Sequence, residues 1–186
     1  STDGMYVVIE GNTRLQIYND LKEENVDGNW DEIDAMVNPP GADSQDFNNK
    51  EAVRLMSHLV GVRPWKPFAK AQYVYELNTV DGWSIQRIIE HAGGKTKQKE
   101  ILAWIKAYGW INEHLIQKGK NPVIERFTCW DELAKSPARL RVLEDYGFTP
   151  EDFSNWVMDE KFTQNNQVRD IPRVFANNRA REAFIQ

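Results

Sequence analysis

The sequence has one cysteine, three histidines and no long run of apolar residues in its 186 positions. The single Cys129 excludes a disulfide framework and a cysteine-rich metal site. His58, His91 and His114 lie far apart without His-x-x-x-His spacing, so we predict no metal-binding residues. Because there is neither a membrane-spanning apolar run nor a signal-peptide pattern, we expect a cytoplasmic protein without membrane contact. Since the first residue is Ser1 and not Met, we expect part of a longer protein.

What is present is a large apolar fraction and an uneven distribution of charge. Hydrophobic residues make up 41% of the chain and include seven tryptophans, which is enough to fill a substantial core. The net charge is −5, but residues 63–120 carry 10 basic and 5 acidic side chains. Residues 1–62 carry 4 basic and 12 acidic side chains, and residues 121–186 carry 9 and 11. A basic middle suits contact with phosphate groups, although charge alone leaves a solvated helix face equally open.

The pattern of apolar residues predicts an α+β fold that is predominantly α-helical. An apolar, β-branched run predicts a buried strand at residues 5–9, and a second strand is expected at residues 33–37, before the turn at residues 38–41. Helical spacing dominates the chain from about Asn48 onward. We expect helices at residues 12–21, 48–60, 67–77, 84–92, 95–108, 130–134, 138–146, 150–158 and 179–184.

The first strand leads into a turn that has the features of a phosphate site. Gly11 would let a ligand approach the backbone closely, and the helix that follows would present free N–H groups to it. Thr13 can supply a hydroxyl, and Arg14 can make a bidentate contact with phosphate oxygens. A capped helix after a glycine is also a common structural device, so these local features leave a purely structural turn open.

Residues 84–106 have the features of a helix-turn-helix. Ser84 can cap a short helix, Gly93 and Gly94 make a turn, and a second helix follows. We expect the second helix to bury Ile101, Leu102 and Ile105 against the first. The residues expected to face DNA at its start are Lys95, Thr96, Lys97, Gln98 and Lys99.

In this interpretation the lysines contact phosphates, while Thr96 or Gln98 reads a base edge. The alternative that remains open is a plain helical hairpin with a lysine-rich solvated face.

These segments resemble the ParB-like family of the ParB/sulfiredoxin superfamily. The run from Asp3 to Leu15 is similar to the family's Gly-x-x-Arg segment, and Trp65, Pro67 and Ala71 match the spacing of its next helix. The resemblance covers residues 3–110 and implies a three-part organisation. The expected parts are residues 1–60, the C-terminal part of a nucleotide- or phosphate-binding core; residues 61–120, a helix-turn-helix region; and residues 121–186, a helical C-terminal region.

The resemblance also implies a ligand and the residues that hold it. A nucleoside triphosphate such as CTP, with Mg²⁺, would bind at Gly11, Asn12, Thr13, Arg14 and Arg63. Ala69 stands where the family has an acidic residue, so nucleotide hydrolysis is not implied, and we assign no catalytic residue.

The predicted function is DNA binding by a ParB-like protein of chromosome or plasmid partition, regulated by the bound nucleotide. Its expected partners are double-stranded DNA and a second copy of the chain, as a homodimer. Two alternatives from other classes stay open. One is an enzyme, either a ParB-like nuclease or a nucleoside triphosphatase, and the other is a helical protein-interaction module.

Overall fold

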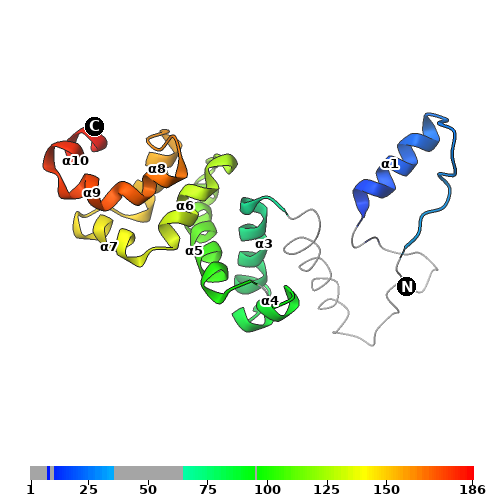
Figure 1. The fold of residues 1–186 in the computed structure, drawn as a ribbon, viewed down its shortest axis with the longest axis horizontal. Coiled ribbons are helices and arrows are strands. Elements are labelled where there is room, and N and C mark those ends of the chain that lie inside the picture. The colour runs from blue at the N-terminus through cyan, green and yellow to red at the C-terminus, as the bar shows by residue number, and fades with distance from the viewer. Residues whose placement is uncertain (1–7, 9–10, 36–64, 95) are drawn as a thin grey trace. The chain divides into compact units, whose positions relative to one another are not determined.

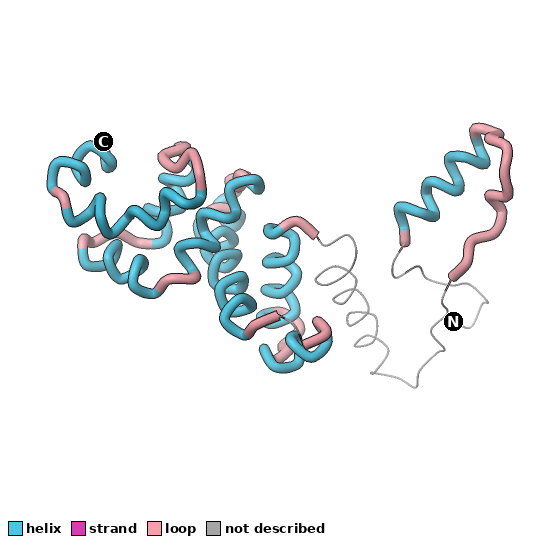
Figure 2. Tube along the Cα trace, viewed as in Figure 1, coloured by secondary structure: helices cyan, strands magenta, loops and turns pink. Residues whose placement is uncertain are grey.

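The computed structural model describes Val8 and residues 11–35, 65–94 and 96–186. The chain divides into two compact units, Ser1–Pro64 and Trp65–Gln186. In both units the described residues form helices joined by turns and loops (Figure 2). Most of these residues belong to the second unit, which carries the candidate site.

The expected strands are not found where the structure describes their positions. Val8 is the one described residue of the first expected strand, and it is not in a strand; neither are residues 33–35 of the second. The remaining positions of both strands lie outside the described residues. The α+β class with a ParB/sulfiredoxin core is therefore wrong, because the described residues are helical and include no strand. A β-branched run becomes a stable strand only with neighbouring strands to bond to, and the described ranges contain none.

The first unit contains one described helix, α1 (Asn12–Glu23), as the sequence predicted (Figure 1). Gly11 precedes it with a φ of 96°, a left-handed conformation that favours glycine. The helix begins with a hydrogen bond from the Leu15 N–H to the Gly11 carbonyl, at 3.0 Å. No residue of α1 is buried among the residues that the structure describes.

The second unit begins with α3 (Pro67–Thr79), α4 (Ile85–His91) and α5 (Gln98–His114). The two longer helices, α3 and α5, pack extensively against each other. The short α4 lies across their ends and contacts both (Figure 1). Ile88 of α4 is fully buried in this arrangement, as the helical spacing of the isoleucines predicted.

Shorter helices follow α5 and pack around it and one another. They are η1 (Ile116–Lys118), η2 (Ile124–Arg126), α6 (Phe127–Ala134), α7 (Pro137–Asp145), α8 (Pro150–Met158), η3 (Asn165–Asp170), α9 (Ile171–Ala176) and α10 (Asn178–Ile185). The predicted helix at 150–158 is confirmed residue for residue. Thr149 and Asp152 form the expected capping box at its start, with the Asp152 N–H 3.3 Å from the Thr149 hydroxyl oxygen.

One hydrophobic core joins α5 to the C-terminal helices, so residues on both sides of Lys120 share it. Trp130 of α6 is fully buried, and its indole N–H donates to the Ser154 hydroxyl of α8 at 3.0 Å. That hydroxyl in turn donates to the Pro150 carbonyl at 2.8 Å. Cys129 is buried beside Trp130, as expected for a small core residue.

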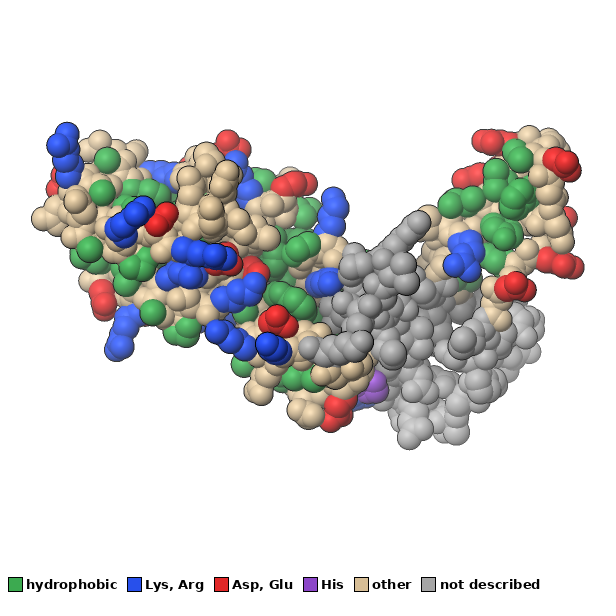
Figure 3. All heavy atoms as spheres, viewed as in Figure 1, with side chains coloured by type: hydrophobic (Ala, Val, Ile, Leu, Met, Phe, Trp, Pro, Cys, Tyr) green, Lys and Arg blue, Asp and Glu red, His purple; other side chains and the backbone are tan. Residues whose placement is uncertain are grey.

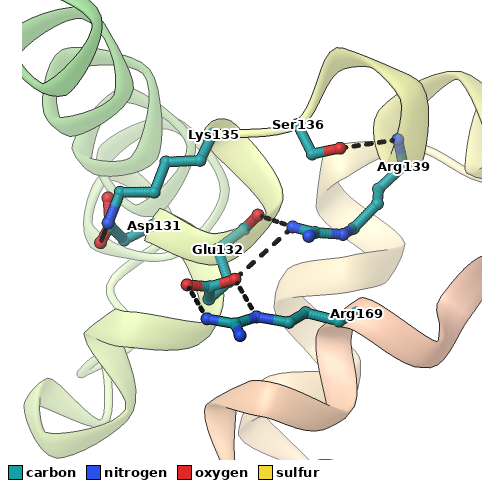
Figure 4. Close-up of polar contacts among 6 residues, drawn as sticks. All are labelled: Asp131, Glu132, Lys135, Ser136, Arg139 and Arg169. Carbon is teal, nitrogen blue, oxygen red and sulfur yellow. Dashed lines mark hydrogen bonds and ion pairs between the residues drawn. The ribbon is translucent and has the colours of Figure 1, made fainter.

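A cluster of charged side chains connects three elements at the edge of this core (Figure 4). The Glu132 carboxylate of α6 receives two hydrogen bonds from the Arg169 guanidinium of η3, at 2.8 and 3.0 Å. Arg139 of α7 lies 3.6 Å from the same carboxylate and also donates to the Glu132 main-chain carbonyl. Glu132 therefore ties α6, α7 and η3 together by charge-assisted hydrogen bonds.

Candidate nucleic-acid interface

The turn between α4 and α5 depends on its two glycines. Ser84 caps α4 as predicted, since its hydroxyl accepts a hydrogen bond from the Arg87 N–H at 3.2 Å. Gly93 and Gly94 follow the helix with φ values of 77° and 70°. The Gly94 N–H donates to the Ile89 carbonyl at 2.9 Å, which closes the last turn of α4. Two consecutive left-handed residues are strained for other amino acids, so the pair fixes how the chain leaves α4.

A tryptophan holds the corner between α3 and α4. Trp83 is buried, and its backbone N–H donates to the Leu77 carbonyl at 2.8 Å. The Arg87 guanidinium carbon lies 4.0 Å from the centre of a Trp83 ring, and the His91 ring lies at 5.1 Å. The Trp83 ring is therefore packed against residues of its own unit. Trp83 is a core residue, as the large number of tryptophans led us to expect of these side chains in general.

The start of α5 differs from the expected helix start in two respects. The helix begins at Gln98, so Thr96 and Lys97 precede it, and Lys95 lies outside the described residues. The Glu100 carboxylate accepts a hydrogen bond from the Lys97 backbone N–H at 3.2 Å. The Glu100 side chain therefore already binds one of the free backbone N–H groups at the start of α5. The positive charge that a ligand would meet there is carried by lysine side chains.

The solvent-exposed face of α5 is polar and basic with one apolar residue in its middle. Gln98, Lys99, Leu102 and Lys106 recur at the three- and four-residue spacing of one helix face, and all four are exposed. Leu102 was expected in the helix interface, but 47% of its surface is accessible. Ile101 is buried as expected, and Ile105 is only partly buried. The other buried residues of α5 are Ala103, Ala107, Tyr108, Trp110 and Ile111.

This face of α5 is one wall of an open groove with a volume of about 540 Å³. Gln98, Lys99, Leu102, Ala103 and Lys106 line it from α5. The other wall, at the junction of α6 and α7, is made by Ala134, Lys135 and Pro137. The groove residues are three lysines around an apolar floor, with no acidic side chain among them. Figure 3 shows several Lys and Arg side chains on this face of the second unit, with hydrophobic surface and some Asp and Glu side chains among them.

Lys135 reaches the groove while its ammonium group is paired with Asp131 of α6 (Figure 4). Asp131 is 7% exposed, and its second carboxylate oxygen, Oδ1, has no hydrogen-bond partner among the described residues. Burial raises the pKa of the Asp131 carboxyl, and the hydrogen bond and charge of Lys135 lower it only in part. Among the described residues, Lys135 is the one ion-pair partner of this carboxylate.

The predicted phosphate turn in the first unit is exposed at the start of α1. Gly11 has open space where a Cβ atom would lie, and no side chain caps the helix. Asn12, Thr13 and Arg14 are exposed on the first turn. Arg63, the fifth predicted residue, lies outside the described residues, so its distance from this turn is not defined. Among the described residues no group of three or more His, Cys, Asp or Glu side chains could hold a metal ion.

Of the predicted DNA-contacting residues, Gln98 and Lys99 lie on α5 and in the groove. Lys106 and Lys135 were missed. Lys106 could have been found because it lies two helical turns after Lys99 on one face. Lys135 comes from another helix, and no spacing within the sequence would have placed it opposite α5.

Comparison of the chain with protein-family models, with curated proteins and with solved structures found no match. Among the described residues, no helix is both long and apolar enough to span a membrane.

Proposed function

We propose that the second unit binds double-stranded DNA through the exposed face of α5, as part of a ParB-like DNA-binding protein. The observation that carries the proposal is the row formed by Gln98, Lys99, Leu102 and Lys106 on the solvent side of a helix that is otherwise packed into the core. The short capped α4, the glycine turn and α5 have the order of a helix-turn-helix. This is also the order that the resemblance to the ParB-like family implies for this part of the chain.

The chemistry of this row suits the major groove of B-form DNA. Lysine side chains bind phosphate oxygens, and most of the affinity of such interfaces is electrostatic. The Gln98 amide can both donate and accept a hydrogen bond, which is the pattern that an adenine edge presents. Leu102 offers an apolar contact of the kind that a thymine methyl group accepts. The exposed leucine thus has a use in a DNA interface that it lacks on a merely solvated helix.

The charges of the chain support the same surface. Residues 65–186 carry 18 basic and 16 acidic side chains, a net charge of +2, although the whole chain has −5. Within residues 95–106 there are four lysines and one acid, Glu100. Phosphate contacts are therefore favoured at the α4–α5 end of the unit, whatever the average charge of the chain.

The first test removes two lysines from the row. Lys99→Ala with Lys106→Ala should weaken binding to duplex DNA and make the slope of log K against log salt concentration shallower by about 2, since each lost phosphate contact removes about 0.9. Fluorescence anisotropy of a labelled duplex between 50 and 200 mM KCl measures both. The matched control is Lys118→Ala with Lys120→Ala, which has the same net charge but changes lysines that contact Glu151 and Asn155 of α8. Equal slopes for the two double variants would refute the proposal.

A second test changes the one acid of this segment. Glu100→Gln keeps a hydrogen-bond acceptor for the Lys97 N–H but removes a negative charge beside the lysines. We expect the variant to bind duplex DNA about threefold to tenfold more tightly at low salt, because like charge across an interface costs affinity. Glu113→Gln, an exposed acid at the other end of α5, is the control with the same change of charge. If both variants gain equally, the gain reflects net charge and not a site at the start of α5.

Binding of a nucleotide such as CTP with Mg²⁺ at Gly11–Arg14 stays a prediction, as do the homodimer and the cytoplasmic location. The exposed helix start and the open space at Gly11 are what support a phosphate ligand there. Titration calorimetry with CTP and ATP, repeated on Arg14→Ala, tests it, with loss of binding in the variant expected. A nicking assay on plasmid DNA separates this function from that of a ParB-like nuclease.

A further inference from the structure

We infer that the groove between α5 and the α6–α7 junction receives the sugar-phosphate backbone of the bound duplex, with Lys135 as a phosphate contact outside the helix-turn-helix. The inference rests on the proposed function and extends its surface to a second element. It assigns a role in DNA binding to Lys135, a residue that lies outside both the helix-turn-helix and the basic α4–α5 segment.

The position of the groove beside α5 is the first reason. A helix in the major groove has a sugar-phosphate backbone on each side, because the groove is only about 12 Å wide. In Figure 1, α4 and α7 lie on opposite sides of α5. Elements on either side of a recognition helix are therefore the ones that meet phosphates, and on the α7 side the wall of the groove is Lys135 and Pro137.

The chemistry of the groove walls is the second reason. Lys99 and Lys106 approach from α5 and Lys135 from α6–α7, so an occupant meets positive charge from both walls. The floor of Ala103, Ala134 and Pro137 contributes no charged group, and a deoxyribose ring can lie on such a surface. No aromatic side chain is among the described residues that line the groove, and it is such side chains on which proteins stack single-stranded bases. The groove is continuous with the exposed row of α5, and charge complementarity thus favours the backbone of a duplex.

The ion pair between Lys135 and Asp131 affects the binding of phosphate by Lys135 in two ways. The buried carboxylate holds the ammonium group in place, which reduces the conformational freedom that phosphate binding would otherwise cost. It also places a negative charge close to the path of the phosphates. Asp131→Asn keeps an acceptor for Lys135 but removes this charge, so we expect it to tighten binding to duplex DNA by about threefold to tenfold.

The deciding experiment replaces both members of the ion pair. In Asp131→Asn with Lys135→Gln no charged partner is left buried alone, and removing both members of such a pair is often tolerated by the fold. The net charge of the chain is unchanged, yet we expect the salt slope for duplex DNA to become shallower by about 1 and affinity near 50 mM KCl to fall severalfold. Circular dichroism melting of each variant verifies that the helices are retained.

The outcomes separate this inference from the proposed function. If the Asp131 and Lys135 double variant keeps the wild-type slope while the Lys99 and Lys106 double variant loses two units, the groove is not a backbone site and DNA binding by α5 stands. If neither differs from the Lys118 and Lys120 control, both proposals fall. If Lys135→Gln weakens binding of a polyglutamate peptide but leaves duplex binding unchanged, the groove serves an acidic protein partner, and the inference is overturned.

Discussion

Trp130→Ala is expected to lower the free energy of unfolding of the second unit by about 3–5 kcal/mol. The side chain is fully buried in the core that joins α5, α6 and α8, so its removal leaves a large cavity. It also leaves the Ser154 hydroxyl without the indole N–H that it accepts. Losses of this size approach the whole stability of a small domain, so the variant should be largely unfolded at 37 °C.

Urea denaturation followed by circular dichroism measures this loss of stability. One further variant separates the contribution of the hydrogen bond from that of the buried ring, and another serves as the control. Ser154→Ala removes the hydrogen bond with little change of volume and should cost about 1–2 kcal/mol. Leu102→Ala is the control, because the same kind of truncation at a half-exposed position should change stability by less than about 0.5 kcal/mol. Comparable losses at Leu102 and Trp130 would show that α5 is buried on the side assigned here to DNA.

The second large effect is expected at Glu132. Glu132→Gln should destabilise the second unit by about 1–2 kcal/mol at pH 7, because it weakens the bidentate contact with Arg169 and the attraction of Arg139. Partial exposure of Arg169 screens its contact, which keeps the expected figure below that of a fully buried pair. Glu144→Gln, an exposed acid on α7, should be nearly neutral in the same urea titration.

The effect of Glu132 depends on pH in a defined direction. The hydrogen bond from Arg169, followed by the positive charges of Arg169 and Arg139, holds the pKa of Glu132 below its ordinary value in the folded protein. A lowered pKa means that the carboxylate stabilises the fold above the unfolded pKa, which is about 4.3. That stability is lost as the pH falls through the lower, folded pKa. The difference between wild type and Glu132→Gln should therefore shrink in acid, and a difference that grew below pH 4 would contradict the assigned contacts.

Helix positions were the part of the fold that the sequence predicted well, because local signals mark helix ends. Ser84, Thr149 and Pro150 each mark a helix start where the structure has one. The start of α5 was placed three residues too early, since Lys95 and Thr96 resemble a polar first turn. The Glu100 side chain, which returns to the Lys97 N–H, fixes the helix start at Gln98.

The strands were wrong for a reason that local patterns cannot reveal. Residues 33–35 belong to the second expected strand, but a strand exists only with a neighbour to share its hydrogen bonds. The described residues do not contain one, and the helical class of the second unit follows from its periodicity alone.

The candidate site was predictable only along one helix. Gln98 and Lys99 follow from the position of the glycine turn, and Lys106 follows from helical spacing. Lys135 and its partner Asp131 required the packing of α6 on α5, which is set by core residues such as Trp130. The burial of Ala103 and exposure of Leu102 depend on the same packing, because a small residue allows α6 to approach where a leucine would not fit.

Because α5 has one buried face and one exposed face, its two sets of residues differ in how well they tolerate substitution. Ile101, Ala107 and Ile111 are buried in the core, whereas Gln98, Lys99, Leu102 and Lys106 are exposed, and of these Lys106 lies 5.2 Å from the centre of the Trp110 ring. Substitutions in the second set can therefore accumulate without loss of the native state. A library randomised at those four positions should yield mostly folded proteins, and under the proposed function its members should differ in the duplex that they prefer.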